Sequence, residues 1–401
     1  MVPKGWVKTN FGSVTNIANG QVDPKIEPYS SMLHIGPENV VSNSGQIIDV
    51  MTCKESNLIS GKYEFDEDAI VYSKIRPNLN KVCQPGFKGV CSADMYPIWA
   101  KSELDIGFLF QYMLGPKFYK IAVAMSMRTG MPKINRSDLN TVPLLLPPIA
   151  EQKKIAQILS SWDKAITTTE QLISNSQQQK KALMQQLLTG KKRLLDKNGV
   201  RFRCDWKEES IGSLLKEVKR PVIWNDDAEY RLLSVKRRSE GVVLREVLKG
   251  HQILTKKMNI ACAGDFLISK MQVVHGASGL VAKEFDGHHV SGSYICLVPK
   301  GKDNLDMNFF SWFAKQKLMY HKAYLCSYGV HIEKLTFNFQ LFLKEKIVIP
   351  SSLEEQQKIA ALLSSAERTI DVLQQKLEAL KQEKRALMQQ LLTGKNRVKI
   401  N

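Results

Sequence analysis

One decapeptide, ALMQQLLTGK, stands at Ala182–Lys191 and again at Ala386–Lys395. Upstream of it, EQKKIAQILSSWDKAI at Glu151–Ile166 aligns without a gap with EQQKIAALLSSAERTI at Glu355–Ile370. Self-similarity at a fixed spacing indicates a fold assembled from repeated structural units. We therefore expect the chain to contain two copies of one unit.

Each copy of this repeat predicts a long helix. Apolar residues follow one another at alternating intervals of four and three, which is the heptad pattern of a coiled-coil seam. A proline-bearing step precedes each helix, and Gly190 and Gly394 are placed to end the helices as left-handed residues. The predicted seam residues are Ile155, Leu159, Trp162, Ile166, Ile173, Leu183, Leu187, Ile359, Leu363, Ile370, Leu373, Leu377, Leu380, Leu387 and Leu391.

Lys180 and Lys384 interrupt the predicted seam at equivalent points of the two copies. A lysine at such a position can fix the register of the pairing at a cost in stability. Alternatively, each side chain can carry its ammonium past the seam into solvent. The GlyLys steps lack the upstream glycine of a phosphate-binding loop, so we interpret them as helix ends.

The segments before the helices are related more weakly. IVYSKI at Ile70–Ile75 aligns with FLISKM at Phe266–Met271, and Trp6 with Trp206. Alternating strand-like runs and amphipathic helical runs predict an α/β fold. We expect two tandem α/β domains, each followed by a long helix, and the two helices pairing as an antiparallel coiled coil with a pseudo-twofold repeat. The expected boundaries are 1–148 and 196–350 for the globular domains, and 149–195 and 351–398 for the helices.

The formal net charge of +18 constrains the partner. No apolar run is long enough to span a bilayer and no membrane-surface helix is evident, so this charge favours a polyanion such as nucleic acid. The seven cysteines are scattered without a CxxC pair, which argues against a zinc site or disulfide framework and for a reduced, cytoplasmic protein. The chain lacks an [ND]PP[YF] aminomethylase motif and a glycine-rich cofactor loop. We therefore expect no catalysis, metal or cofactor in this chain.

Taken together, these motifs resemble the specificity (S) subunit of Type I restriction–modification enzymes. The resemblance covers nearly the whole chain and is carried by VPLLLPPIAEQKKIAQIL at Val142–Leu159, by IVIPSSLEEQQKIAALL at Ile347–Leu363 and by both LLTGK endings. SKIRPNLNK at Ser73–Lys81 and TGMPKINRSDL at Thr129–Leu139 also resemble the family. The second half departs from the pattern, with ProSerSer in place of ProPro and GVHIEKLTF in place of TGMPKINRSDL.

The resemblance implies a division of labour. Each globular domain would be a target recognition domain that reads one half of an interrupted site in double-stranded DNA. The helices would set the gap between the halves and dock two modification subunits, which bind S-adenosylmethionine and methylate adenine at N6; restriction subunits would join for cleavage. A helix of about 36 residues spans ~54 Å, enough to separate two recognition domains by one DNA turn of ~34 Å.

Candidate DNA-contacting residues lie in two segments of each half. Arginine can pair with guanine and asparagine with adenine, whereas most lysines are expected on phosphates. The alternatives are a solvated basic loop and, at Asn135 or Ser137, a helix N-cap. The candidates are Lys74, Arg76, Asn78, Asn80, Lys81, Arg128, Thr129, Lys133, Asn135 and Arg136 in the first half, and Lys270, Gln272, His275, Tyr328, His331 and Lys334 in the second.

Two other classes of function remain open at this point. The chain could be a coiled-coil scaffold with globular heads and no sequence-specific DNA role. It could also be a self-contained nuclease or methylase, although such an enzyme needs catalytic motifs that the sequence lacks. A specificity subunit should bind DNA with an affinity that falls steeply as salt rises, whereas a scaffold without a DNA role should not.

Overall fold

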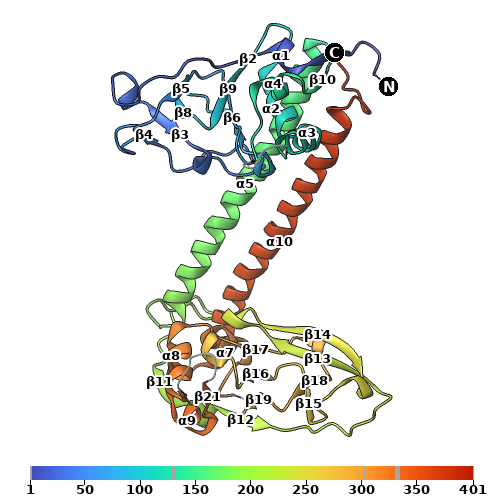
Figure 1. Cartoon of the computed structure of the whole chain (residues 1–401). Coiled ribbons are helices and arrows are strands. Elements are labelled where there is room, and N and C mark those ends of the chain that lie inside the picture. Colours follow the sequence, from blue (N-terminus) through green and yellow to red (C-terminus); the bar gives the residue numbers. More distant parts are fainter. Residues whose placement is uncertain (1, 128–131, 302, 330–334, 401) are drawn as a thin grey trace. The chain divides into compact units, whose positions relative to one another are not determined.

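The chain forms two compact units in a computed structural model, of which Figure 1 shows the ribbon. Unit 1 comprises Met1–Leu172 with Leu373–Asn401, and unit 2 comprises Ile173–Val372. Each unit thus contains one globular domain and part of both long helices, whereas the sequence suggested four segments in series. The residues described by the structure are 2–127, 132–301, 303–329 and 335–400.

The two long helices are α5 (Ile149–Leu187) and α10 (Leu353–Leu391), each of 39 residues. Both end earlier than the helical segments expected at 149–195 and 351–398. The reason is the glycine of each LLTGK motif, since Gly190 and Gly394 adopt φ angles of 70° and 69°, in the left-handed region that terminates helices. The residues that follow each glycine turn back onto the globular domains.

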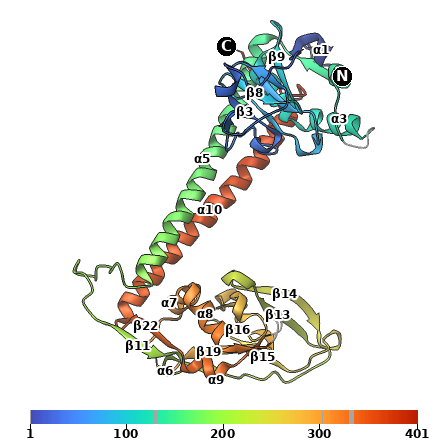
Figure 2. The same cartoon turned by 60° about the vertical axis from the view of Figure 1, so that its left-hand side comes forward.

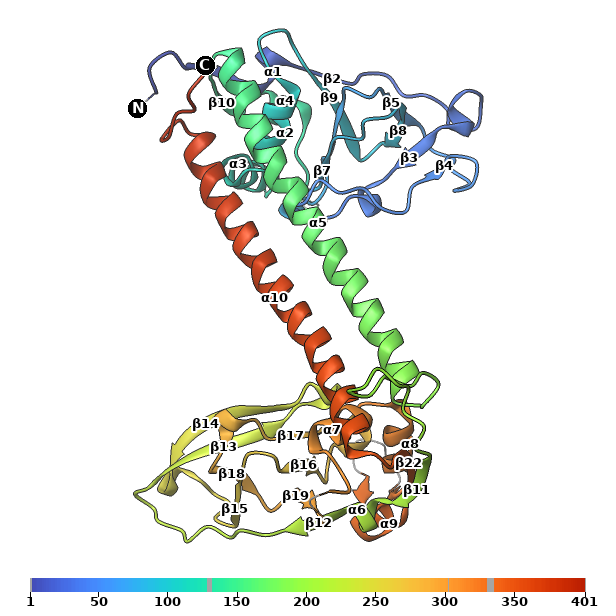
Figure 3. The same ribbon diagram turned by 180° about the vertical axis from the view of Figure 1, so that it is seen from behind.

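Within each unit the two helix segments lie side by side and run in opposite directions, as the three views agree (Figures 1, 2 and 3). The two seam lysines are ion-paired across this contact. In unit 1 the Lys384 ammonium lies 2.5 Å from a carboxylate oxygen of Asp163, and Lys384 is only 8% exposed. In unit 2 Lys180 pairs with Glu367, the counterpart of Asp163 in the repeat. Each lysine therefore stays at the helix contact with a carboxylate partner.

The apolar residues of the predicted seam are all buried or half-buried. Those near the helix ends enter the globular cores: Ile155, Leu159 and Leu391 in unit 1, and Leu187 with Leu363 in unit 2. By contrast, other large apolar side chains of the same helices are exposed, namely Leu172, Leu362 and Val372. This burial pattern fits the heptad prediction along both helices.

Within its described residues, the first globular domain contains two four-stranded sheets and a two-stranded ribbon. Its strands are β1 (Val7–Asn10), β2 (Thr15–Ile17), β3 (Leu33–Ile35), β4 (Met51–Thr52), β5 (Lys62–Phe65), β6 (Ile70–Ser73), β7 (Val82–Cys83), β8 (Gly89–Ser92), β9 (Met95–Ala100) and β10 (Pro143–Leu146). The sheet orders are β2-β9-β6-β7 and β4-β3-β8-β5, and β1 pairs with β10. All these pairs are antiparallel except β3 with β8.

The second globular domain repeats this topology. Its strands are β11 (Trp206–Ser210), β12 (Leu215–Val218), β13 (Glu229–Val235), β14 (Val242–Lys249), β15 (Met258–Ala261), β16 (Phe266–Ser269), β17 (Ser278–Leu280), β18 (His288–Ser291), β19 (Tyr294–Pro299), β20 (Ser327–Tyr328), β21 (Thr336–Phe337) and β22 (Lys346–Pro350). The orders β12-β19-β16-β17 and β14-β13-β18-β15 match the first domain, and β13 with β18 is again a parallel pair. β11 pairs with β22, and β20 with β21.

Short helices cover one sheet in each domain and form the larger cores. In the first domain Phe108 and Phe118 pack with the strand residues Ile70 and Ile98. Asp105 caps the helix that carries Phe108 by accepting a hydrogen bond from its amide. The helices are α1 (Phe11–Val14), α2 (Ile106–Leu114), α3 (Pro116–Ser126) and α4 (Arg136–Asn140), then α6 (Ile211–Leu214), α7 (Met307–Ala314), α8 (Lys317–Leu325) and α9 (Phe339–Lys344). The predicted α/β class and paired helices are confirmed.

A buried carboxylate joins the start of one helix to the end of the other. Glu151, in the first turn of α5, is fully buried and accepts two hydrogen bonds, of 2.6 and 2.7 Å, from the Arg397 guanidinium beyond α10. The Trp6 indole donates a third bond to the same carboxylate, at 3.2 Å. Arg397 also bonds the Lys4 carbonyl. We call this pairing the Glu–Arg latch.

Unit 2 contains the same latch built from the opposite helix ends. Glu355, in the first turn of α10, accepts two bonds of 2.6 and 2.7 Å from Arg193, which follows α5. The neighbouring glutamines are also fixed, because the buried Gln152 amide donates to the Glu103 and Pro147 carbonyls. Gln356 makes the equivalent bonds in unit 2. The GluGln pair of each repeat therefore docks its helix onto its domain.

The latch predicts a loss of stability when its arginine is removed. Arg397→Ala leaves the buried Glu151 carboxylate without its cation, and we expect the free energy of unfolding of unit 1 to fall clearly. Lys399→Ala removes the same charge from an exposed position in the same tail and should change the free energy by less than about 0.5 kcal/mol.

Urea unfolding measures both variants, and amide exchange within 149–159 assigns the change to unit 1. Equal stability of the two variants would contradict the role of the latch. The free energy of unfolding of Arg397→Lys should lie between those of the two alanine variants, because lysine keeps the charge but cannot form the bidentate hydrogen bond.

Candidate DNA interface

The two predicted DNA-contacting segments of the first domain meet in space. Ile75 and Lys133 form an antiparallel bridge, flanked by a 2.8 Å bond from the Arg76 amide to the Pro132 carbonyl. A second bond of 2.9 Å runs from the Ile134 amide to the Lys74 carbonyl. The structure therefore assembles one surface from residues that are far apart in the sequence. Arg128 and Thr129 lie outside the described residues.

Two tyrosines that the sequence analysis did not single out organise this surface. The Arg136 guanidinium lies 5.2 Å from the ring centre of Tyr96 and 5.5 Å from that of Tyr63. The Lys74 ammonium lies 5.3 Å from the same Tyr96 ring. Burial raises the pKa of Tyr96, and the nearby Arg136 charge partly opposes this shift. Cation–π contacts hold both cations in place while their remaining donors stay available.

Asn135 occupies the N-cap position of α4, as one of the alternatives anticipated, but its side chain makes no capping hydrogen bond. It is exposed, as is Lys133. The side-chain amide of Asn135 is therefore exposed to solvent.

The loop at Arg76–Asn80 has a strained backbone. Arg76 and Asn80 adopt φ angles of 47° and 45°, in the left-handed region that non-glycine residues seldom occupy. Between them lies a short 3-10 helix, Pro77–Leu79. Arg76 and Asn78 are exposed. Backbone strain of this kind is typical of ligand-binding loops.

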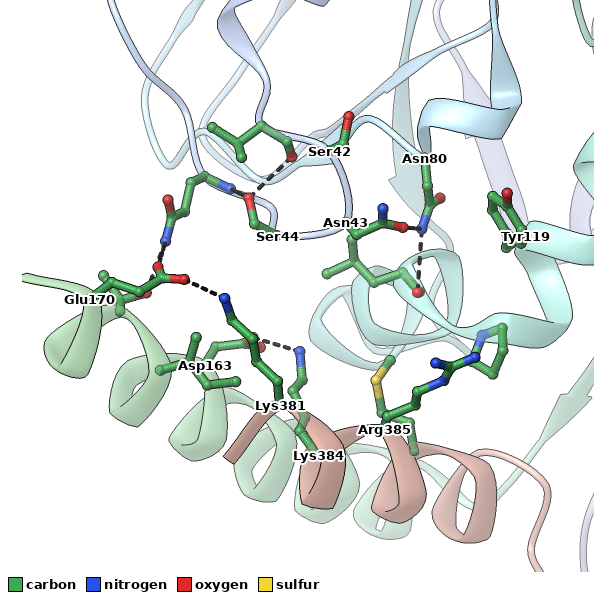
Figure 4. A pocket seen from close by; sticks show the side chains of 17 residues that line it. Ser42, Asn43, Ser44, Asn80, Tyr119, Asp163, Glu170, Lys381, Lys384 and Arg385 are labelled. Carbon is green, nitrogen blue, oxygen red and sulfur yellow. Dashed lines mark hydrogen bonds and ion pairs between the residues drawn. The ribbon is translucent and has the colours of Figure 1, made fainter. Parts of the chain in front are cut away.

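Asn80 and Lys81 both make hydrogen bonds within the protein. Asn80 is 2% exposed, and its amide nitrogen donates to the Asn43 side chain at 3.2 Å and to the Leu114 carbonyl at 3.4 Å. Lys81 donates to the Pro37 carbonyl. Figure 4 shows Asn80 and Asn43 facing each other at the edge of a hollow of about 550 Å³. Left-handed turns at both ends of the 3-10 helix rotate Asn80 inward, so this geometry gives both residues a structural task.

The second domain places its candidates at an equivalent strand exit. The Lys270 amide bonds to the Ser293 carbonyl, as the Lys74 amide bonds to that of Asp94. Gln272 and His275 are half-buried around a 3-10 helix at Val273–His275. Tyr328 is 61% exposed in β20. His331 and Lys334 lie outside the described residues.

The second domain also has a basic turn that was not among the predicted candidates. Lys236, Arg237 and Arg238 are exposed between β13 and β14. Ser239 fixes this turn beside the candidate loop, because its amide bonds to the Gly276 carbonyl at 2.9 Å and its hydroxyl lies 2.5 Å from the Tyr320 hydroxyl. The available signal was the run of three basic residues between two strand-like patterns.

Other kinds of site are not evident in the described residues. No group of three or more histidine, cysteine, aspartate or glutamate side chains there is placed to hold a metal ion. Among the same residues, no helix is both long enough and apolar enough to cross a membrane.

Comparison with known proteins agrees with this arrangement. A family model described as "Type I restriction modification DNA specificity domain" matches residues 3–176 and again residues 205–382. The Type I restriction enzyme EcoDI specificity subunit of Escherichia coli is 39% identical over 156 residues, which are 39% of this chain and 34% of that protein. The match thus spans about a third of the E. coli relative.

Other similarities extend over the whole chain. The Type I restriction enzyme MjaVIII specificity subunit of Methanocaldococcus jannaschii is 22% identical over 99% of this chain and 94% of its own length. Among solved structures, the Type-I restriction-modification system S subunit from M. genitalium covers 99% of this chain and 97% of its own, with a TM-score of 0.61 and 13% identity. The HsdS subunit from Thermoanaerobacter tengcongensis covers 98% of both chains, with a TM-score of 0.50 and 18% identity.

These two structures share the fold of this chain. The family model matches most of the sequence, once in each half of the repeat. The chain belongs to the Type I restriction modification DNA specificity family and carries two copies of its domain.

Proposed function

We propose that this chain is the DNA sequence-specificity subunit of a Type I restriction–modification complex. Each globular domain reads one half of an interrupted site in double-stranded DNA. One observation carries the proposal. Lys74 directly follows β6 and Lys270 directly follows β16, and at these equivalent points the two domains present polar and basic loops of different sequence. Two copies of one frame with unlike loops suit two unlike half-sites.

The proposed contacts divide by chemistry. Arg76 and Arg136 present guanidinium groups that can pair with guanine, and Asn78 and Asn135 present exposed amides that can pair with adenine. Lys133 is placed for phosphates. The corresponding set in the second domain is Lys270, Gln272, His275 and Tyr328. Four further residues are proposed on sequence grounds alone, namely Arg128, Thr129, His331 and Lys334.

The paired helices are proposed to set the gap between the half-sites and to dock two modification subunits. Those subunits bind S-adenosylmethionine and methylate adenine at N6, and restriction subunits join the complex for cleavage. This chain supplies no catalytic group and no cofactor site. The complex acts in the cytoplasm, where the chain meets DNA.

The division of labour predicts the activity of the purified parts. The chain alone should transfer no methyl group from S-adenosylmethionine to DNA, and adding its modification subunits should produce N6-methyladenine. Incorporation of labelled methyl groups measures both samples. Methylation of adenine by the chain alone, at a rate that follows its concentration, would contradict the non-catalytic assignment.

Independent reading by the two domains predicts the result of a domain exchange. Replacing residues 1–148 with the matching domain of another family member should change the bases of one half-site and leave the other half-site as it was. Sequencing of N6-methyladenine in cells that carry the hybrid complex identifies both halves. A simultaneous change in both halves would rule out modular reading, and DNA binding without any fixed motif would favour the scaffold alternative.

The spacer role predicts the effect of longer helices. Seven residues inserted between Gln179 and Lys180, and seven more between Glu367 and Arg368, preserve the heptad pattern on both helices. The insertions add about 10 Å of helix, so the gap should grow by at most about three base pairs. Motif sequencing gives the new gap. Seven residues in α5 alone are the control, which should mismatch the helices and abolish assembly. An unchanged gap with full activity in the double insertion would refute the spacer role.

A further inference from the structure

Four lysines surround one hollow in the second globular domain. The hollow has a volume of about 410 Å³ and is bounded by the chain after β12 and by the ends of β15, β16 and β19. Asn259 and Tyr294 contribute to its wall. The lysines are Lys219, Lys256, Lys257 and Lys270. We call this feature the lysine hollow. Because Lys270 belongs to the proposed DNA interface, the hollow is continuous with that surface.

A short backbone ladder brings these lysines together. The Val222 amide bonds to the Met258 carbonyl at 3.0 Å, and the Ile260 amide to the Arg220 carbonyl at 2.8 Å. The chain after β12 is thereby held against the edge of β15. Lys219, which precedes this ladder, and Lys256 with Lys257, which precede β15, line the same hollow.

The first domain forms the same ladder without these lysines. There the Val22 amide bonds to the Lys62 carbonyl at 2.8 Å, in the register of the bond between Val222 and Met258. The positions equivalent to Lys219, Lys256 and Lys257 are occupied by Asn19, Ser60 and Gly61. Of the four lysines, only Lys270 has a lysine counterpart, Lys74. The three additional lysines are therefore not needed to build the junction.

Carboxylates compensate this charge only in part. Lys256 pairs with Asp226 at 2.7 Å, and Glu217 lies 3.9 Å from Lys219. The Lys270 ammonium donates to the Gly292 carbonyl at 2.9 Å. Lys257 is exposed, and in the described part of the chain no carboxylate pairs with its ammonium. Like charges gathered around one hollow repel each other, so a bound polyanion relieves an unfavourable interaction.

We propose that the lysine hollow binds backbone phosphates of the DNA next to the second half-site, with Lys219 and Lys257 as the principal contacts. The assignment rests on the proposed function. Lysine presents a point charge that attracts phosphate without selecting a base, and a tyrosine hydroxyl such as that of Tyr294 can donate to the same oxygens. The hollow therefore positions the second domain on the duplex, through three lysines that have no lysine counterpart at the equivalent positions of the first domain.

The test compares two double variants that remove the same charge. Lys219→Ala with Lys257→Ala empties the hollow of its principal contacts. Lys249→Ala with Lys283→Ala removes two exposed lysines of the same domain outside the hollow. The dissociation constant of the full chain with its modification subunits is measured on DNA carrying the methylated motif, over a series of salt concentrations.

We expect the slope of log binding constant against log salt to become shallower by about 1.8 in the hollow variant, since each lost phosphate contact contributes about 0.9. The slope of the control should stay at the wild-type value. The methylated bases should be the same in all three complexes, because phosphate contacts carry no sequence information. Lys257→Arg should retain the wild-type slope and Lys257→Glu should not.

The contrary outcomes are distinct. If the wild-type complex binds its motif but the hollow variant keeps the wild-type salt slope, the proposed phosphate contact is wrong and the proposed function is not affected. The same holds if the salt slope changes equally in the hollow variant and in the control. Altered bases in the second half-site would show base reading instead of phosphate contact. Failure of the wild-type complex to bind its motif would overturn the proposed function, and the hollow with it.

Discussion

Two buried carboxylates determine how this chain is put together. Glu151 and Glu355 each lie in the first turn of a long helix, where water does not reach them, and each receives both prongs of an arginine. An unpaired carboxylate in such a place is strongly unfavourable, so the arginine has to be present. Because Arg193 follows α5 and Arg397 follows α10, each helix must begin in one domain and end in the other. The latch thereby favours the antiparallel pairing of the two helices, whose ends are set by Gly190 and Gly394.

The middle of the helix pair is held by weaker interactions that nevertheless select one register. Lys384 pairs with Asp163, and Lys180 with Glu367, so the repeat places the same charge pair in both units. A one-residue slide of one helix along the other would separate both pairs at once and move half-buried leucines off the contact. Apolar residues between the latches provide attraction, and the two lysines provide registry.

Local sequence signals predicted the helices well because their causes are local. The heptad spacing and the glycine of LLTGK are read within one or two turns, and Gly190 and Gly394 do end their helices. The latch could not be foreseen in this way, since nothing near Arg397 indicates a glutamate in the other repeat. The inward rotation of Asn80 depends on two left-handed residues, whose conformation the sequence does not specify. Likewise, the meeting of Lys74 with Arg136 over Tyr96 is a tertiary event.

The two units become complete at different times while the chain is synthesised. Unit 2 is one continuous stretch, Ile173–Val372, whereas unit 1 also needs Leu373–Asn401. On the ribosome, the second domain therefore has all of its residues before the first domain does. Until the final tail emerges, Glu151 has no arginine, and the core around Ile155 lacks Leu391. The domain that is synthesised first is therefore completed after the second domain, once Leu373–Asn401 has been added.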